Sequence, residues 1–285
     1  MSADTSGRRN FVTHAGSLDI IGRTDAGRVR GHNEDAIGEN ADIGLIVLAD
    51  GMGGYKGGEV ASALAVNTIL QELEIAIPGI APGETDSDTG YSRQSLAARH
   101  SIIKANETIY KTAQSQPQYQ GMGTTVVMGI FHNNNVTVAH VGDSRMYRYR
   151  DEKLEQITVD HTLLQELVDR GFYTQEEARE SLNKNLVTRA LGIETSVAVD
   201  IYEDLAFPGD IYLLCSDGLN DMIDDEDIHL TIKTFSASLD KAADHLIQLA
   251  NENGGKDNVS VVLARPTKVF SGKRHWRQRL IDWFF

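Results

Sequence analysis

The stretch Leu45-Ile-Val-Leu-Ala-Asp50-Gly51-Met-Gly-Gly54 is an apolar run that ends in an aspartate followed by glycines. A short apolar run bounded by a glycine-rich turn predicts a buried strand with its last carboxylate at the rim of the core. Two further runs have the same form, Val138-Ala-His-Val-Gly-Asp143 and Ile211-Tyr-Leu-Leu-Cys-Ser-Asp217. These three strands predict a β core with an acidic site at one edge.

Two more aspartates lie in short polar motifs, Asp35 in Arg30-Gly-His-Asn-Glu-Asp35 and Asp257 in Gly254-Gly-Lys-Asp257-Asn-Val-Ser260. Taken alone, each such motif is also compatible with an ordinary turn. Several carboxylates brought together would repel one another unless divalent cations neutralised them, and oxygen-only ligands favour Mg²⁺ or Mn²⁺. Together, the aspartates therefore predict a multinuclear metal site.

The composition is that of one large globular domain, with 285 residues, 41% hydrophobic and 24% charged. The net charge of −14 argues against nucleic-acid binding, because phosphate backbones attract basic surfaces. Residues 1–17 show no secretory signal, and the apolar stretches are too short to cross a bilayer. The single cysteine, Cys215, lies in an apolar run, which favours a buried structural thiol over a reactive one. We therefore expect a cytoplasmic protein.

Periodicity predicts an α+β layered fold, because helices are grouped between runs of strands. The turn His132-Asn-Asn-Asn135 predicts a hairpin, and Pro208-Gly209 is expected to join a second strand pair. Strands are predicted at residues 18–23, 43–49, 124–131, 136–141, 146–150, 197–205, 210–215 and 259–264, and helices at residues 59–74, 92–114, 225–235 and 239–251.

Three segments lie outside this core pattern. Residues 1–17 are predicted to form a flexible leader. Residues 160–189 carry the capping-box spacing Thr174-Gln-Glu-Glu177, which fits a small helical flap beside the site or an ordinary surface insertion. Residues 266–285 form a basic-aromatic tail, which suits docking on a membrane surface or a partner, or a terminal helix packed onto its own domain.

The glycines after Asp50 lack the Gly-x-x-x-x-Gly-Lys-[Ser/Thr] spacing that cradles nucleotide phosphates. This argues against a nucleotide site. Gly51 would instead let its backbone carbonyl approach a metal without obstruction by a side chain.

The order of the motifs resembles that of the metal-dependent serine/threonine protein phosphatases of type 2C, and is closest to the bacterial branch. The resemblance spans about residues 18–265 and implies two antiparallel β-sheets packed as a sandwich and flanked by helix pairs, a four-layer αββα fold with its metals at one end. The matching motifs are Arg30-x-x-Asn-Glu-Asp35, Ala49-Asp-Gly-Met-Gly-Gly54, Gly121-Met-Gly-Thr-Thr125, Ala139-His-Val-Gly-Asp-Ser-Arg145, Ser216-Asp-Gly218 and Gly255-Lys-Asp-Asn-Val-Ser260.

The resemblance implies two Mn²⁺ or Mg²⁺ ions and, as in bacterial members, a weaker third ion. Asp50 would bridge the first two, Gly51 would provide its carbonyl oxygen, and Asp217 and Asp257 would ligate the same centre. Asp35 would lie close to the second metal through bound water.

The third ion would be held by Asp143 together with Asp217. Arg30 matches the phosphate-binding arginine, and the guanidinium fork suits a phosphate oxyanion. Glu34 is expected to lie behind the ligands as a hydrogen-bond acceptor. His161 is placed behind them too, either in a structural role or as the proton donor to the leaving group.

The implied function is hydrolysis of phosphoserine and phosphothreonine by a metal-activated water, with Arg30, Asp50 and Asp217 as the catalytic residues. Phosphorylated proteins are the expected substrates, and a bacterial-type serine/threonine kinase is the expected opposing enzyme. Met52 replaces the histidine that many eukaryotic members carry after Asp-Gly, so either water at a metal or another group such as His161 must protonate the leaving group. Two alternatives remain, a catalytically silent phosphopeptide-binding regulator and a phosphatase of small metabolites.

Overall fold

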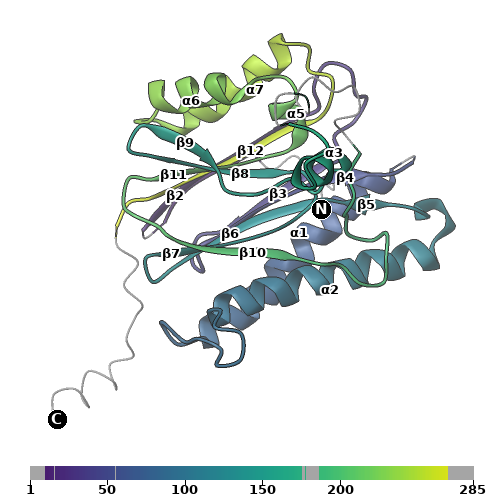
Figure 1. The fold of residues 1–285 in the computed structure, drawn as a ribbon, viewed down its shortest axis with the longest axis horizontal. Coiled ribbons are helices and arrows are strands. Elements are labelled where there is room, and N and C mark those ends of the chain that lie inside the picture. Colours follow the sequence, from purple (N-terminus) through teal and green to yellow (C-terminus); the bar gives the residue numbers. More distant parts are fainter. Residues whose placement is uncertain (1–9, 16, 55, 175–176, 178–185, 269–285) are drawn as a thin grey trace, which may run out of the picture.

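The computed structural model describes residues 10–15, 17–54, 56–174, 177 and 186–268. Two antiparallel sheets pack face to face, and each is covered on its outer side by helices (Figure 1). The predicted αββα sandwich is confirmed.

The first sheet has the strand order β1-β2-β12-β11-β8-β9, and the second has the order β10-β7-β6-β4-β3 with β5 paired to the end of β4. The strands of the first sheet are β1 (Phe11–Ala15), β2 (Leu18–Asp25), β12 (Val259–Pro266), β11 (Ile211–Cys215), β8 (Arg145–Arg150) and β9 (Lys153–Gln156). Those of the second are β10 (Asp200–Leu205), β7 (Asn135–Val141), β6 (Val126–His132), β4 (Leu45–Met52), β3 (Asp35–Asn40) and β5 (Gly123–Thr124).

Alternation along β4 shows how the layers are built, because successive side chains point to opposite faces of a strand. Ile46 and Leu48 belong to the core between the two sheets, whereas Leu45 and Val47 belong to the core beneath the helices. All four are fully buried. A strand that is buried on both faces therefore reads as the continuous apolar run found in the sequence.

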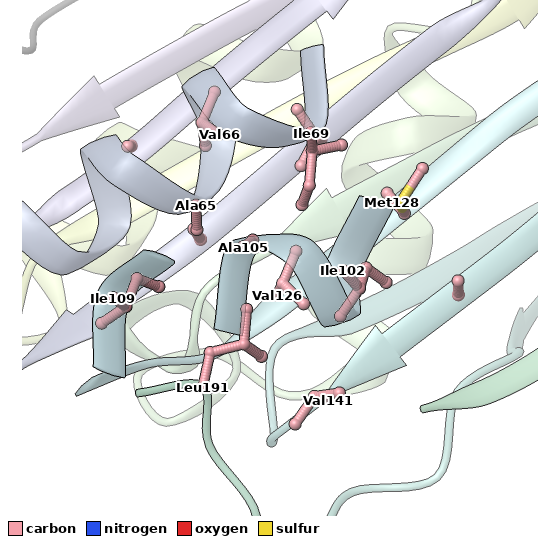
Figure 2. Packing of buried hydrophobic residues seen from close by; sticks show 14 of the residues in the cluster. Ala65, Val66, Ile69, Ile102, Ala105, Ile109, Val126, Met128, Val141 and Leu191 are labelled. Carbon is pink, nitrogen blue, oxygen red and sulfur yellow. The ribbon is translucent and has the colours of Figure 1, made fainter. Parts of the chain in front are cut away.

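Helices α1 (Gly57–Ala76) and α2 (Arg93–Ser115) cover the second sheet, and α6 (Asp225–Thr234) and α7 (Leu239–Glu252) cover the first (Figure 1). Figure 2 shows Ile69 of α1 and Ile102 of α2 among the buried side chains that pack with Met128 of β6. Among the described residues, the short helices are α3 (Leu163–Asp169), α5 (Asp217–Asn220), η1 (Ile77–Gly79) and η2 (Pro117–Tyr119).

The expectation that no segment is long and apolar enough to cross a bilayer is wrong for Gly57–Gly79. Ala61, Ala65, Ile69 and Leu73 of this segment are fully buried against α2 and the second sheet. Its apolar character therefore belongs to a core helix.

Three strands were not expected from the sequence. β1 lies within the proposed leader, where residues 11–15 pair with β2 from Phe11–Gly22 to Ala15–Leu18. The flexible-leader prediction is thus wrong for residues 11–15, and residues 1–9 and 16 lie outside the described chain. β3 was missed because its sequence is half polar. β9 was missed because the turn before it contains no glycine to mark it, although Asp151 and Glu152 have positive φ values of 50° and 58°.

Of the two predicted hairpins, one is confirmed and one is wrong. β6 and β7 pair around Asn133 and Asn134, whose φ values of 46° and 62° match the primed hairpin turns. By contrast, β10 pairs with β7 while β11 pairs with β12 and β8. The Pro208-Gly209 turn therefore carries the chain from one sheet to the other.

The proposed flap begins with α3, whose N-cap residue Thr162 accepts a hydrogen bond from Gln165 N at 3.2 Å. The capping box is also present, since Thr174 N donates to Glu177 Oε2 at 2.8 Å and Glu177 N donates to Thr174 Oγ1 at 3.2 Å. Residues 175–176 and 178–185 of the flap, and residues 269–285 of the tail, lie outside the described chain.

Candidate metal centre

Strand pairing brings Asp143 and Asp217 to the same edge of the sandwich. β8 and β11 run antiparallel with Arg145 opposite Cys215. Asp143 precedes this pair by two residues and Asp217 follows it by two, so both leave the first sheet at one end. The sequence alone predicted two strand ends, and the register shows that they meet.

Asp35 and Asp50 lie directly opposite each other on β3 and β4 of the second sheet. Asp35 is 3% exposed, and its Oδ2 accepts hydrogen bonds from Ser216 Oγ at 2.9 Å and Ser260 Oγ at 2.6 Å. Its Oδ1 is buried without a hydrogen-bond partner, and burial raises the pKa of Asp35 to about 6. A buried carboxylate oxygen without a partner is costly unless it binds a proton or a cation.

The carboxylates also act on one another. Burial raises the pKa of Asp50 well above its usual range, and the charges of Asp35, Asp217, Asp143 and Asp257 raise it further. Burial and then the charge of Asp143 do the same for the pKa of Asp217. Buried carboxylates whose charges raise one another's pKa favour the binding of divalent cations, and an all-oxygen donor set fits Mn²⁺ or Mg²⁺.

Arg30 lies at the solvent-exposed edge of this group. Its Nη2 donates to Asp257 Oδ2 at 2.7 Å, and the two side chains are 54% and 36% exposed. The hydrogen bond to Asp257 raises the pKa of Arg30. The structure therefore puts the predicted phosphate ligand beside a predicted metal ligand.

Asn258, to which the sequence assigned no role, holds the loop before β3 in place. Its Oδ1 accepts from Glu34 N at 2.8 Å, and its Nδ2 donates to Ala26 O at 3.0 Å and to His32 O at 2.9 Å. A Cβ at Gly218 would lie 1.9 Å from Asn258 O. Asn258 therefore holds the segments that carry Asp35, Asp217 and Asp257 in contact with one another.

Gly51 is needed for a reason that the sequence did not indicate. A Cβ at this position would lie 2.1 Å from Gly58 O and 2.5 Å from Glu34 O, and Gly51 N donates to Glu34 O at 3.2 Å. Close packing of three backbone segments therefore demands a glycine. Glu34 itself has a side chain that is 15% exposed, and burial raises its pKa.

Thr125 joins the two halves of the site, and its role was also missed. Thr125 N donates to Asp50 O at 2.8 Å, and Asp50 N donates to Thr125 Oγ1 at 3.1 Å. The same hydroxyl lies 2.7 Å from Ser144 Oγ, next to Asp143. The paired threonines of Gly121-Met-Gly-Thr-Thr125 were the available signal, but only the fold shows what Thr125 reaches.

A comparison with protein families decides the identity. Residues 26–260 match the family model described as protein phosphatase 2C. The chain belongs to the protein phosphatase 2C family.

Bacterial members of the family resemble this chain over most of its length. The serine/threonine phosphatase stp of Listeria welshimeri is 37% identical over 254 residues, which cover 88% of this chain and 97% of that protein. The serine/threonine protein phosphatase PstP of Mycobacterium tuberculosis is 41% identical over 249 residues, which cover 87% of this chain and 45% of that protein.

Solved structures of the family agree with the fold. The Mycobacterium tuberculosis phosphatase PstP/Ppp superposes with a TM-score of 0.78 and 36% identity, covering 88% of this chain and all of that one. The catalytic domain of PstP in complex with two manganese ions gives a TM-score of 0.71 with 37% identity, over 87% of this chain and 98% of that one.

Within this phosphatase fold, His161 lies behind Asp143. It is 4% exposed, and its Nδ1 accepts a hydrogen bond from Gly142 N at 3.0 Å. Burial and the neighbouring His140 lower the pKa of His161 to about 4, so the ring is neutral at pH 7. A buried neutral ring with both nitrogens facing protein groups favours a structural role over proton donation to a leaving group.

The raised carboxylate pKa values predict that metal binding depends on pH. Asp143, with a pKa of about 6, must release its proton to hold a cation, and Asp35, with the same pKa, must release its proton to bind water beside one. In the metal-free protein, the protonated form of these two carboxyl groups stabilises the fold. This stabilisation is complete below their unfolded pKa, near 3.8, and is lost as the pH rises through their folded pKa of about 6. The apparent affinity for Mn²⁺ should therefore increase from about pH 5 to pH 7.

Titration calorimetry in two buffers of different ionisation enthalpy measures this effect. We expect Mn²⁺ binding at about pH 6 to release protons into the buffer. An affinity that stays constant across this window, with no proton release, would contradict the raised pKa values.

Proposed function

We propose that this chain hydrolyses phosphoserine and phosphothreonine in proteins, with Mn²⁺ or Mg²⁺ as its cofactor. The observation that carries the proposal is the convergence of carboxylates with raised pKa values at one end of the sandwich, with Arg30 at the edge. When bound, paired divalent ions acidify a water molecule and offset the negative charge of the phosphoryl group.

Each residue of the site would have a separate role. Asp50, Asp217 and Asp257 with the carbonyl of Gly51 would hold the ions, and Asp35 would anchor water beside them. Asp143 would complete an outer, weaker position together with Asp217. Ser216 and Ser260 fix the orientation of Asp35 through their hydroxyl hydrogen bonds.

Phosphate release from a phosphothreonine peptide tests the function. We expect release in the presence of Mn²⁺ and none in excess chelator. Peptide binding without release would favour the silent regulator, but every carboxylate of the proposed set is present in the chain. A strong preference for small phosphometabolites over phosphopeptides would favour the metabolite phosphatase.

Arg30→Ala should raise the Michaelis constant for a phosphopeptide by about ten- to a hundredfold, because a charge-assisted hydrogen bond to phosphate is worth about 1.5–3 kcal/mol. The affinity for Mn²⁺ should stay nearly unchanged, because Arg30 touches Asp257 only at the exposed edge. Steady-state kinetics and calorimetry on the same variant measure both quantities.

Arg28→Ala is the matched control, because Arg28 is exposed in the same loop and only its backbone amide bonds to Gly255 O, at 2.7 Å. We expect this variant to behave like the unchanged protein. Loss of Mn²⁺ binding in Arg30→Ala would instead make Arg30 a structural partner of the carboxylates.

We further propose that the enzyme acts in the cytoplasm, in signalling, against a bacterial-type serine/threonine kinase, and that residues 266–285 recruit it to an anionic membrane surface or partner. Pro266 and Thr267 still belong to the fold, since Gly209 N donates to Pro266 O and Thr267 N donates to Ser17 O, each at 2.8 Å. A boundary at Arg265 is therefore too early, and a truncated chain should end at Lys268.

That truncated chain should remain folded and hydrolyse small phosphoesters at an unchanged rate, yet lose binding to anionic vesicles. β12 runs from the end that carries Asp257 to Pro266, so the tail begins roughly 30 Å from the metal centre. A fall of several degrees in melting temperature would instead show that the tail packs on its own domain.

A further inference from the structure

A cluster of polar side chains joins strands β7 and β10 to the two ends of the flap, next to the loop that carries Asp143. The rings of His140 on β7 and His161 stack with their centroids 4.5 Å apart. His161 Nε2 lies 3.3 Å from Asp200 Oδ2 on β10, and Arg189 Nη1 donates to Asp200 Oδ1 at 2.8 Å. Both histidines are nearly fully buried.

The ring nitrogens of His140, His161 and the Asp200 carboxylate are close enough to hold a cation, but the hydrogen bonds argue against one. Gly142 N–H donates to His161 Nδ1, so the proton of the neutral ring lies on Nε2 and faces Asp200. Binding a metal through Nε2 would put that proton on Nδ1, directly against Gly142 N–H. The hydrogen bond from Gly142 N–H therefore argues against a metal ion at His161 Nε2.

His161 instead connects the flap to the Asp143 loop. Its backbone N donates to Gly142 O at 3.0 Å while its ring accepts from Gly142 N at 3.0 Å, so the two residues are joined reciprocally. Thr188 N, at the far end of the flap, donates to His161 O at 2.8 Å. One residue thus joins both ends of the flap to the peptide before Asp143.

The neighbouring residue holds the other side of the same loop. Asp160 accepts from Arg145 Nε at 2.9 Å and from Arg145 Nη2 at 2.7 Å. Asp143 therefore lies between two anchored positions, Gly142 and Arg145, and both anchors come from the start of the flap. A bidentate guanidinium pair and a buried reciprocal backbone pair leave this loop little freedom.

We infer that His161 is a positioning residue for Asp143, which it orients through the hydrogen bond from Gly142 N–H to its Nδ1. This rests on the proposed function, in which Asp143 holds the outer and weakest metal. A change at His161 would then alter the occupancy of that metal through Gly142, without His161 itself holding the ion.

Two substitutions separate the two sides of the ring. His161→Asn keeps an acceptor where Nδ1 lies and loses the contact to Asp200, whereas His161→Gln keeps a polar group toward Asp200 and loses the acceptor for Gly142. We expect His161→Gln to raise the Mn²⁺ concentration for half-maximal phosphopeptide turnover by about tenfold. His161→Asn should recover most of this loss, and Asp200→Ala, which leaves the Gly142 bond intact, should have little effect.

Hydrogen exchange at the Gly142 amide gives a second readout that needs no turnover. Exchange should be faster in His161→Gln than in His161→Asn or Asp200→Ala, and calorimetry should show weakening of the lowest-affinity Mn²⁺ site only in His161→Gln. Equal exchange and equal Mn²⁺ affinity in the two His161 variants would overturn the inference. If the unchanged protein releases no phosphate, the proposed function fails, while exchange and calorimetry still test the role of His161.

Discussion

Asp50→Asn and Asp217→Asn are each expected to lower phosphopeptide turnover by about two to three orders of magnitude, the size of effect seen when one preorganised electrostatic group is removed from an active site. Each change takes a negative charge from a group of carboxylates that act on one another, so it weakens the whole ligand set. Steady-state hydrolysis of a phosphothreonine peptide at saturating Mn²⁺ measures the loss.

In the absence of metal, the same two variants should be at least as stable as the parent protein. Removing one of several repelling buried carboxylates relieves repulsion, so neither variant should melt at a lower temperature than the parent in chelator. A large drop in melting temperature would show that the lost turnover comes from misfolding.

Cys215→Ser is the control for this experiment. Burial raises the pKa of the Cys215 thiol to about 12, and the residue is fully buried, so it cannot act as a thiolate nucleophile near neutral pH. Turnover should persist in a folded Cys215→Ser protein. Hydrolysis that survives excess chelator would contradict the metal-dependent function itself.

Gly218→Ala is expected to lower both stability and metal affinity. Its added methyl would lie 1.9 Å from Asn258 O, a backbone atom that can move only by displacing the loop held by the Asn258 side chain. Overpacking of this kind costs about 3 kcal/mol, which lowers the melting temperature by roughly 5–10 °C in a domain of this size. Thermal melts with and without Mn²⁺ measure both effects.

Gly79→Ala provides the matched control, because a Cβ there would meet no atom within 4 Å. Its melting temperature should stay close to that of the parent. If Gly218→Ala also melts like the parent, the contact between the Asp217 and Asp257 motifs is looser than the structure indicates.

The sequence predicted the parts of the site that depend on local pattern. The apolar run before Asp50 and the apolar run before Asp217 each indicate a strand that ends in a carboxylate, and the structure has strands there. What could not be predicted depends on contacts between distant segments. Asn258 reaches Glu34 across 224 positions of the chain, and no local pattern marks the partner of an asparagine side chain.

The assignment of strands to sheets failed for a similar reason. A proline-glycine turn such as Pro208-Gly209 can close a hairpin or carry the chain to a facing sheet, and only the packing of β10 and β11 decides between them. β3 was missed because Ala36 and Ile37 are its only adjacent apolar residues, so the sequence shows neither an apolar run nor a clear alternation.

The two sheets contribute different carboxylates, with Asp35 and Asp50 from one and Asp217 and Asp257 from the other. Cations bound between them would act as a clamp across the sandwich, because sliding one sheet over the other would separate the ligands. Metal binding and resistance to shear between the sheets are then thermodynamically linked, so Mn²⁺ should slow hydrogen exchange in β4 and β11 together. Exchange slowed in only one of the two strands would show that the ions are held by a single sheet.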